Sequence, residues 1–304
     1  MHRSWIAPTS RSALWGRDGF LLSYDRAVHS DFLVHWTGRD IDATHHPQWY
    51  TTDHRSKTSA VVDDLYLKRL RDVLRFGLWM TEDSRDAQTI GYQEYRVPQE
   101  ARCCFTELRL SESRRHAALY GRLGIGVKRP FVFQRGGRPL IYFGFGANSH
   151  SDRFVQACFR DLQDKSLLNF FKPMNSQTHQ LTYELYAESE WRILFFEQLL
   201  KQRKVIDPRD PANAAEHEYY LSLTEKEQER LRYLIPLDGW LGVVIYPSLT
   251  AKDRAQWDDS TEIRREVTRI KSDQGDHANR VEGWGAPRRG NWPIELNLDA
   301  CRNL

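Results

Sequence analysis

The sequence lacks any apolar segment long enough to form a membrane-spanning helix. No stretch of the 304 residues approaches the roughly 20 consecutive apolar residues that a bilayer requires. Trp5 and Ile6 near the N-terminus are not followed by the apolar region of a secretory signal. Internal repeats and low-complexity tracts are also absent. We therefore expect a soluble protein that has no membrane partner.

Cysteine is scarce, which argues against a disulfide-stabilised secreted domain. The four cysteines are Cys103, Cys104, Cys158 and Cys301. Adjacent cysteines on a strand point to opposite faces and cannot pair easily. Neither Cys-x-x-Cys nor a Cys/His spacing typical of zinc occurs, and His45, His46 and His54 lie in one polar loop without regular ligand spacing. These observations predict a reduced, cytoplasmic protein and leave a metal site as a minor alternative.

Aromatic residues, by contrast, are plentiful, and ten of them are tryptophans. Such a composition excludes a disordered chain. Residues 1–30 contain Pro8, Gly16 and Gly19 and predict an irregular lead-in to a single domain over residues 31–304. In this domain, candidate strands and helices mix without a regular βα alternation. That order favours an α+β fold, with a mixed, split sheet flanked by helices, over a doubly wound sheet.

Hydrophobic periodicity and end signals locate the main elements. The expected strands are 32–36, 78–81, 103–108, 191–196, 241–246 and 294–298. The expected helices are 60–76, 111–120, 151–162, 225–234 and 262–271, and loops are expected over 82–99 and 204–215. The clearest helix, 60–76, places Leu65, Leu70, Val73 and Leu74 on one face and ends before Gly77. Thr224 and Glu227 form the sequence signature of a capping box.

Residues 102–143 read as strand, helix, strand, turn and strand. Ser111 is expected to cap the helix and Gly121 to end it. From residue 101 to 140 there are nine Lys or Arg against two acids, a net charge of +7, whereas the whole chain carries +3 and the remainder therefore −4. This local charge predicts an anionic partner, which could be a nucleotide, RNA or the acidic face of another protein. The alternative is a solvated helix face, and His116 is expected to be either part of an anion site or a solvated residue on that helix.

Three short motifs carry candidate chemistry: His35-x-Thr37-Gly38, Cys104-Phe-Thr106-Glu, and Glu188-x-Glu190. If Glu188 and Glu190 share a strand, alternation places both carboxylates on one face. Two neighbouring carboxylates raise at least one pKa unless a cation or a hydroxyl donor lies nearby. Such a pair suits general-base catalysis or binding of ribose hydroxyls. The alternative is that Arg192, on the same face, simply pairs with Glu190.

The order of these motifs resembles the layout of ADP-ribosyltransferases. In both, a His-x-Thr strand precedes a helix that ends in Gly-Leu, a later strand carries a hydroxyl, and the catalytic glutamate comes after that strand. The resemblance implies an ADP-ribosyltransferase-like fold with NAD as cofactor. It assigns ribose binding to His35 and the role of catalytic acid to Glu190. Glu188 is a catalytic candidate on the separate ground that it pairs with Glu190 in the Glu-x-Glu motif.

The same resemblance implies further roles in the pocket. Thr37 and Gly38 are expected to lie against the nicotinamide, and Thr106 to shape the pocket. Tyr120 or Tyr142 is expected to stack on the nicotinamide ring. Trp36 departs from the pattern, because glycine is common at this position in the family and an indole could crowd the nicotinamide site.

A second resemblance covers most of the chain. Its motifs are Leu33-Val-His-Trp-Thr-Gly38, Phe76-Gly-Leu78, Cys104-Phe-Thr-Glu-Leu108, Leu110-Ser111, His116, Tyr120-Gly121, Gly124-Ile-Gly-Val-Lys128 and Glu188-Ser-Glu-Trp-Arg-Ile193. Together they resemble the AbiGi family of bacterial abortive-infection proteins, which is regarded as the antitoxin half of a phage-defence pair. The resemblance implies a defence role, and its partner would be a cognate, nucleotidyltransferase-like toxin.

Two functions from different classes therefore compete. The first is an antitoxin-like component of a phage-defence system that acts by binding its toxin. The second is an NAD-dependent ADP-ribosyltransferase or NAD glycohydrolase that uses His35, Thr106 and Glu190. The enzyme requires these three residues around one open cleft, whereas a scaffold permits Arg192 to cap Glu190 and Trp36 to fill the cleft. A DNA-binding regulator is less favoured, because there is no helix-turn-helix signature and the net charge is low for a duplex binder.

Overall fold

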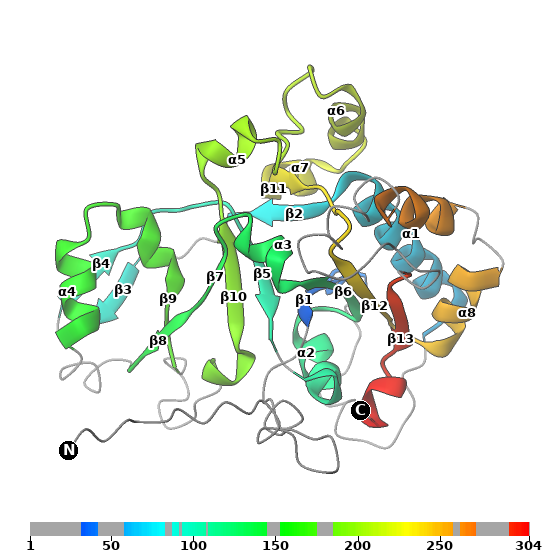
Figure 1. Ribbon diagram of the computed structural model, residues 1–304, viewed down its shortest axis with the longest axis horizontal. Coiled ribbons are helices and arrows are strands. Elements are labelled where there is room, and N and C mark those ends of the chain that lie inside the picture. Colours follow the sequence, from blue (N-terminus) through cyan, green and yellow to red (C-terminus); the bar gives the residue numbers. More distant parts are fainter. Residues whose placement is uncertain are drawn as a thin grey trace, which may run out of the picture.

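The computed structural model describes residues 32–41, 58–82, 87–90, 93–107, 109–144, 153–174, 185–257, 262–271 and 292–303. Within these residues the protein is α+β, with a mixed sheet flanked by helices (Figure 1). The expected lead-in over residues 1–30 lies outside the described residues, as does the loop that carries the three histidines.

In the described ranges, the main sheet has nine strands. They are β1 (Phe32–Thr37), β2 (Leu78–Thr81), β5 (Arg102–Thr106), β6 (Leu123–Lys128), β7 (Arg138–Pro139), β10 (Glu190–Leu194), β11 (Leu231–Ile235), β12 (Leu241–Tyr246) and β13 (Ile294–Asn297). Two smaller strand pairs are β3 (Ala87–Ile90) with β4 (Gln93–Arg96) and β8 (Ile141–Phe143) with β9 (Phe171–Pro173).

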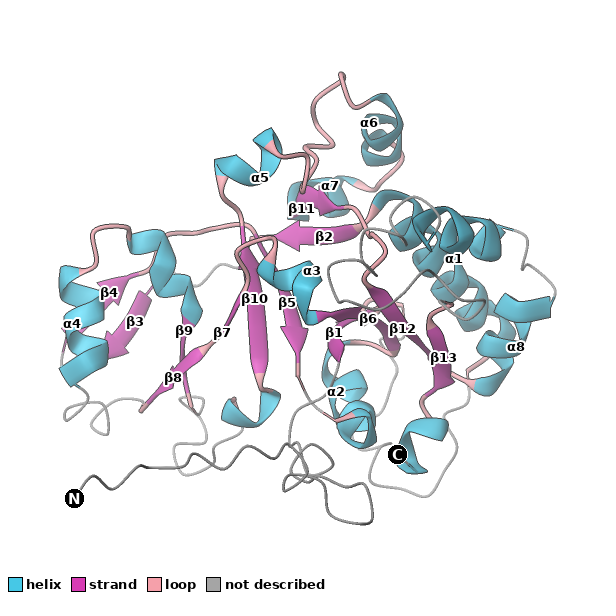
Figure 2. Cartoon of the chain, viewed as in Figure 1, coloured by secondary structure: helices cyan, strands magenta, loops and turns pink. Residues whose placement is uncertain are grey.

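The helices surround these strands. The α-helices are α1 (Ala60–Phe76), α2 (Ser113–Tyr120), α3 (Arg129–Phe133), α4 (Arg153–Asp161), α5 (Glu197–Lys201), α6 (Ala214–Leu221), α7 (Glu225–Arg230) and α8 (Leu249–Trp257). Residues 262–271 are also helical. Short 3-10 turns are η4 (Leu110–Glu112), η6 (Lys165–Phe170), η7 (Tyr186–Glu188) and η8 (Ala300–Asn303). Figure 2 shows α5, α6 and α7 at one end of the sheet beside β2 and β11.

Strand β5 is the point at which the sheet divides. The strand order is β11-β2-β5-β1-β6-β12-β13, and β10 pairs along the whole of β5 on its other edge. On the first edge, β5 meets β2 only at Thr81↔Arg102 and β1 only at Val34↔Thr106. Between these two pairs, no strand in the described part of the chain bonds to this edge of β5. Side chains can therefore occupy the gap between β5 and the neighbouring strands β1 and β2.

Apolar packing covers both faces of the sheet. On one face, α1 and the helix at 262–271 bury Tyr66, Leu70 and Ile270 against β6 and β12. On the other face, α2 and η8 pack with Val34 and Trp36 of β1. A separate apolar cluster around Phe143 and Phe159 joins α4, η6 and the β8–β9 pair, which lie to one side of the main sheet (Figure 1). The elements on both faces of the sheet are thus held in place by apolar packing.

The helix predicted over residues 60–76 is confirmed at both ends. The Ser59 hydroxyl accepts a hydrogen bond from the Val62 amide, and Gly77 has a φ of +110°. A Cβ at Gly77 would lie 2.2 Å from the Ile235 carbonyl oxygen, so both conformation and space require glycine. The predicted apolar face is wrong in one place, because Leu65 is exposed whereas Asp63 is fully buried. Asp63 Oδ1 accepts hydrogen bonds from Thr58 and Ser248, which compensates burial at that oxygen.

Other expectations need correction. Residues 82–99 are not a single loop, because they contain the β3–β4 hairpin. Ser111 does not cap α2; it lies inside η4, and α2 begins at Ser113 without a side-chain cap. The capping box of Thr224 is confirmed, but α7 ends at Arg230 because the next five residues pair with β2 as β11. Helices α3, α5, α6 and α8 were not predicted. The apolar residues of α6 and α8 show little helical periodicity.

Candidate functional site

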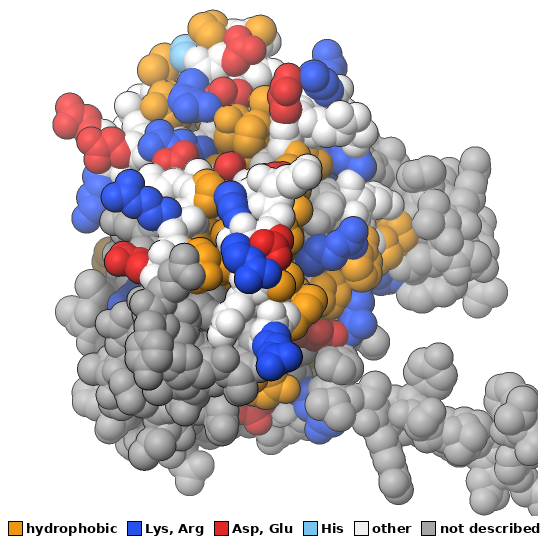
Figure 3. Space-filling model, turned by 90° about the vertical axis from the view of Figure 1, so that its left-hand side faces the viewer, with side chains coloured by type: hydrophobic (Ala, Val, Ile, Leu, Met, Phe, Trp, Pro, Cys, Tyr) orange, Lys and Arg blue, Asp and Glu red, His pale blue; other side chains and the backbone are white. Residues whose placement is uncertain are grey.

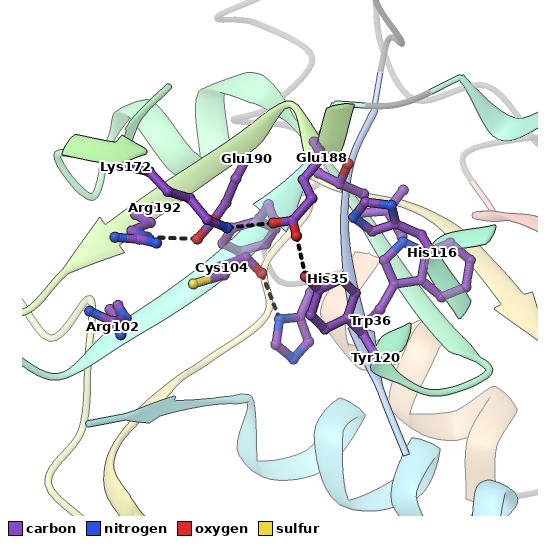
Figure 4. A pocket seen from close by; sticks show the side chains of 13 residues that line it. His35, Trp36, Arg102, Cys104, His116, Tyr120, Lys172, Glu188, Glu190 and Arg192 are labelled. Atoms are coloured by element: carbon purple, nitrogen blue, oxygen red, sulfur yellow. Dashed lines mark hydrogen bonds and ion pairs between the residues drawn. The ribbon is translucent and has the colours of Figure 1, made fainter. Parts of the chain in front are cut away.

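A cavity of about 240 Å³ lies where β1 and β5 separate (Figure 4). Its walls come from β1, β5, α2, β9, η7 and β10. The polar and aromatic side chains that line it are His35, Trp36, Arg102, Cys104, Thr106, His116, Tyr120, Lys172, Glu188, Glu190 and Arg192. The predicted catalytic set of His35, Thr106, Glu188 and Glu190 is therefore brought together around one cavity, with Tyr120 beside it.

Two buried cations hold the two carboxylates. The ammonium of Lys172 lies 2.5 Å from Glu188 Oε2 and 2.6 Å from Glu190 Oε2. Arg192 Nε lies 2.6 Å from the other oxygen of Glu190. Figure 4 shows Lys172, Arg192 and Arg102 on one side of the carboxylates and the rings of Trp36, His116 and Tyr120 on the other. The alternative in which Arg192 pairs with Glu190 is thus confirmed, and Lys172 joins the pair to Glu188.

The placement of Glu188 differs from the prediction. Glu188 lies in η7 rather than on a strand, and Ser189 after it has a φ of +45° before Glu190 begins β10. Strand alternation therefore does not explain why the two carboxylates meet. Instead, the turn brings Glu188 back over the sheet, where Thr106 Oγ1 donates a 2.6 Å hydrogen bond to its carbonyl oxygen. Thr106 thus fixes the backbone of this turn.

The charge on Glu190 is stabilised rather than suppressed. Burial raises the pKa of this carboxyl, but the charges of Arg192 and Lys172 outweigh burial and hold the pKa well below its usual range. At neutral pH Glu190 is therefore expected to act as a carboxylate rather than as a proton donor, and its catalytic role stays a prediction. A fixed carboxylate can still accept hydrogen bonds from hydroxyl groups or stabilise a developing positive charge.

His35 spans the break in the sheet. Its Nδ1 lies 2.9 Å from the carbonyl oxygen of Cys104. Because a carbonyl can only accept, Nδ1 carries the proton, and Nε2 of the neutral ring is left as an acceptor. Burial lowers the pKa of His35, and the charge of Arg69 lowers it further, against the Cys104 carbonyl, which raises it. A neutral imidazole with an open acceptor can bind a hydroxyl group.

Tyr120 and Cys104 complete the inner wall. The Tyr120 hydroxyl donates to Glu188 Oε1 at 2.6 Å, and burial together with Glu188 raises the pKa of Tyr120. The tyrosine is therefore a neutral hydrogen-bond donor. Burial, with the nearby charge of Glu190, raises the pKa of the Cys104 thiol to about 12. This thiol is protonated at neutral pH, so it is not a nucleophile.

His116 is neither solvated nor part of an exposed basic helix face. It is buried in the cavity wall, with its ring centroid 5.2 Å from that of Tyr120. Burial, with the charges of Lys172 and Arg115, lowers the pKa of His116 to about 4. Trp36 packs at the same wall without filling the cavity, and its indole nitrogen has no hydrogen-bond partner among the described residues. Both rings therefore present a neutral surface at physiological pH.

Thr37 and Gly38 are not part of this cavity. They line an adjoining hollow of about 400 Å³ on the far side of His35. Thr37 Oγ1 lies 3.3 Å from an Arg69 nitrogen. Gly38 has a φ of +96°, and a Cβ there would lie 2.4 Å from the Tyr66 ring, so glycine is required. The two residues predicted for the nicotinamide end are therefore separated from the carboxylates by His35.

The basic stretch 101–140 does not form a continuous basic surface. Four of its nine cations are buried, namely Arg102, Arg114, Arg122 and Arg135. Arg102 bonds to Asn169 at 3.1 Å, and Arg135 lies 3.3 Å from Asp238. On the face shown in Figure 3, the described Lys and Arg side chains are scattered among acidic and hydrophobic ones. Much of the local excess of positive charge is therefore buried and does not form a surface for a partner.

Lys172 and Asn169 are site residues that the sequence analysis did not identify. The Asn169 carbonyl accepts a 2.5 Å hydrogen bond from Arg192, and its amide donates to Pro98 at 2.9 Å. The available signal was the lysine itself, which interrupts the aromatic run Phe170-Phe171-Lys172. A charge in such a run requires a partner if the run is buried.

Comparisons with protein-family models, curated proteins and solved structures found no match for this chain. No helix in the described part of the chain combines the length and apolar character needed to span a membrane. Among the described residues, no group of three or more His, Cys, Asp or Glu side chains is placed to hold a metal ion. The geometry of the cavity therefore carries the functional argument.

Proposed function

We propose that this chain is an ADP-ribosyltransferase-like protein that binds NAD and cleaves its bond between nicotinamide and ribose. The observation that carries the proposal is the convergence of His35, Thr106, Tyr120 and Glu190 on one cavity at the break in the sheet. These residues come from β1, β5, α2 and β10, so their meeting is a property of the tertiary structure. They fulfil the geometric condition set for an enzyme, which is one open cleft around His35, Thr106 and Glu190.

The chemistry assigned to each group follows from its charge state. The open acceptor of His35 binds a ribose hydroxyl. The Glu190 carboxylate accepts a second hydroxyl and stabilises positive charge on the ribose as the C–N bond breaks. Nicotinamide leaves as a neutral base with the electron pair of that bond. Water or an acceptor nucleophile then forms the new bond to the ribose and loses a proton.

The test is release of nicotinamide from NAD by the purified chain. We expect turnover by the wild type and a loss of about 100-fold or more in Glu190→Gln, because a positioned charge is removed from the transition state. Glu197→Gln, at an exposed α5 residue, is the matched control. Because Glu190→Gln also disturbs buried ion pairs, cooperative unfolding of the variant and NAD binding by the wild type are measured alongside. Absence of both binding and turnover in the wild type contradicts the proposal.

A second candidate is an antitoxin-like partner in a bacterial phage-defence pair. The observation that favours it is the pairing of Glu190 with Lys172 and Arg192, because paired carboxylates suit a scaffold that binds without turnover. This candidate also rests on the resemblance to the AbiGi family and on a cytoplasmic location.

Co-expression with a toxin encoded beside the gene provides its test. If the wild type and Glu190→Gln both restore growth of cells that express the toxin, and both co-purify with it, a binding function is supported. If only a wild type that turns over NAD restores growth, a binding function is contradicted. A nucleotide or RNA at residues 101–140 stays a prediction.

A further inference from the structure

The hollow beyond His35 has a basic rim that the sequence analysis did not identify. It adjoins the inner cavity, and the two share His35, Trp36, Arg102, Cys104 and Tyr120 as lining residues. Its outer lining includes Arg39 after β1, Arg69 on α1 and Arg230 at the end of α7. Three guanidinium groups from separate elements therefore surround one hollow of about 400 Å³.

Within the part of the chain that the structure describes, the acids at this hollow accept hydrogen bonds or ion pairs, whereas two of its arginines form neither. Asp40 accepts from Arg69 at 2.7 Å, and Glu82 lies 3.1 Å from Arg232. Glu227 accepts from the Thr224 amide at 3.0 Å as part of the capping box. By contrast, Arg39 and Arg230 are exposed and form no hydrogen bond or ion pair within the described part of the chain. Their donors are available to a ligand.

Arg69 and Arg230 line the same hollow as Asp40, and both act on the charge of its carboxylate. Burial raises the pKa of Asp40, but the paired Arg69 and the charge of Arg230 outweigh it and lower the pKa. Arg69 also lies over the Trp79 ring, with its guanidinium carbon 5.8 Å from the ring centroid. Thr37 adds a hydroxyl 3.3 Å from Arg69. The rim thus combines planar cations, a hydroxyl and an aromatic face.

We propose that this hollow is a binding site for the diphosphate of a nucleotide. Guanidinium groups present paired donors that match phosphate oxygens, and Arg is favoured wherever such planar recognition is needed. Because the hollow adjoins the inner cavity, a dinucleotide can place its diphosphate at the arginines and a ribose beside His35 and Glu190. The assignment to NAD rests on the proposed function, whereas binding of a nucleoside diphosphate does not.

A small nucleotide fits the geometry better than RNA does. Single-stranded nucleic acid is bound by a basic groove that follows its backbone over several nucleotides. The free arginines here converge on one hollow, and four of the nine cations of the 101–140 stretch are buried. The site therefore accommodates one diphosphate rather than a long phosphate chain.

The test is calorimetric titration of the whole chain with ADP, ADP-ribose and adenosine. We expect ADP and ADP-ribose to bind at least tenfold more tightly than adenosine, with an affinity that falls as salt is raised. Arg39→Gln and Arg230→Gln are each expected to weaken ADP binding about tenfold, because a charge-assisted hydrogen bond is lost. The control is Arg138→Gln, at an exposed arginine outside both cavities.

The outcomes separate this proposal from the proposed function. ADP binding that depends on Arg39 and Arg230 supports the diphosphate site even if NAD is never cleaved. NAD cleavage with an unchanged KM in both arginine variants overturns the diphosphate site and leaves the proposed function intact. Equal affinity for ADP and adenosine also overturns it. The diphosphate site is also overturned if an RNA oligonucleotide binds more tightly than ADP and Arg138→Gln weakens that RNA binding. In that case the basic stretch 101–140 is the binding surface.

Discussion

The inner cavity and the outer hollow are neighbours, yet their charged side chains differ in burial and in pairing. In the cavity, Lys172, Glu188, Glu190 and Arg192 are buried and each is paired with another. At the hollow, Arg39 and Arg230 are exposed and without an ion pair among the described residues. The reason is desolvation, since a buried charge is costly unless paired, whereas water stabilises an exposed one. The cavity charges therefore support the fold as well as a ligand, whereas Arg39 and Arg230 at the hollow are available to a ligand.

The largest effect is expected from removing the cation between the carboxylates. Lys172→Met leaves Glu188 and Glu190 buried with less compensation and should lower the free energy of unfolding by about 3–5 kcal/mol. Urea denaturation measures the change. Lys201→Met provides the control, because Lys201 pairs with Glu197 on an exposed surface and should cost at most about 0.5 kcal/mol. Equal losses in the two variants would show that the cavity charges do not stabilise the fold.

The second effect concerns acid stability. The pKa of His116 is about 4 in the folded protein and about 6.5 in an unfolded chain. Between these values the unfolded state binds more protons, so stability is fully present above pH 6.5 and is lost as the pH falls towards 4. From pH 7 to pH 5 this histidine should cost about 2 kcal/mol. The charged groups that act on it are Lys172, Arg115 and Glu190.

Urea denaturation at pH 7 and pH 5 measures that loss. His116→Gln should remove most of it, since the variant has no imidazole to protonate. His217→Gln, at a half-buried histidine on α6, should retain the wild-type pH dependence. If His116→Gln loses as much unfolding free energy between pH 7 and pH 5 as the wild type does, His116 is not a buried neutral histidine.

A smaller effect is expected at the edge of the cavity. Tyr120→Phe removes the hydrogen bond to Glu188 and should lower the free energy of unfolding by about 1–2 kcal/mol. Tyr186→Phe is the control, because Tyr186 is 56% exposed. Thermal unfolding of both variants checks the prediction. If Tyr186→Phe lowers the free energy of unfolding as much as Tyr120→Phe does, the hydrogen bond from Tyr120 to Glu188 does not stabilise the fold.

The smallest effect is expected at the hollow. Arg39→Gln and Arg230→Gln should each change the free energy of unfolding by less than about 0.5 kcal/mol, since exposed side chains away from packing contribute little. The same urea denaturation provides the measurement. A loss above 1 kcal/mol in either variant would mean that these arginines support the fold, and the contrast between hollow and cavity would then be lost.

Local sequence signals predicted the elements that depend on neighbours in the chain. The helix from Ala60 to Phe76 has both its cap and its terminal glycine in the sequence, and the capping box at Thr224 is equally local. The end of α7 was missed because residues 231–235 become a strand only by pairing with β2. Burial of Asp63 and His116 depends on partners far along the chain, so periodicity alone placed neither.

The sequence by itself determined the α+β class, the strand that carries His35 and the presence of two nearby carboxylates. Through motif order and resemblance it also predicted His35, Thr106, Tyr120, Glu188 and Glu190 as residues of one site, and these five residues line one cavity. Only the tertiary structure decided that Lys172, from a distant segment, bridges both carboxylates and that Arg192 supplies the second positive charge. It alone separated Thr37 and Gly38 from them and brought Arg39, Arg69 and Arg230 to one hollow. The physical reason is that charge state depends on burial and on distant partners, which strand pairing around β5 creates.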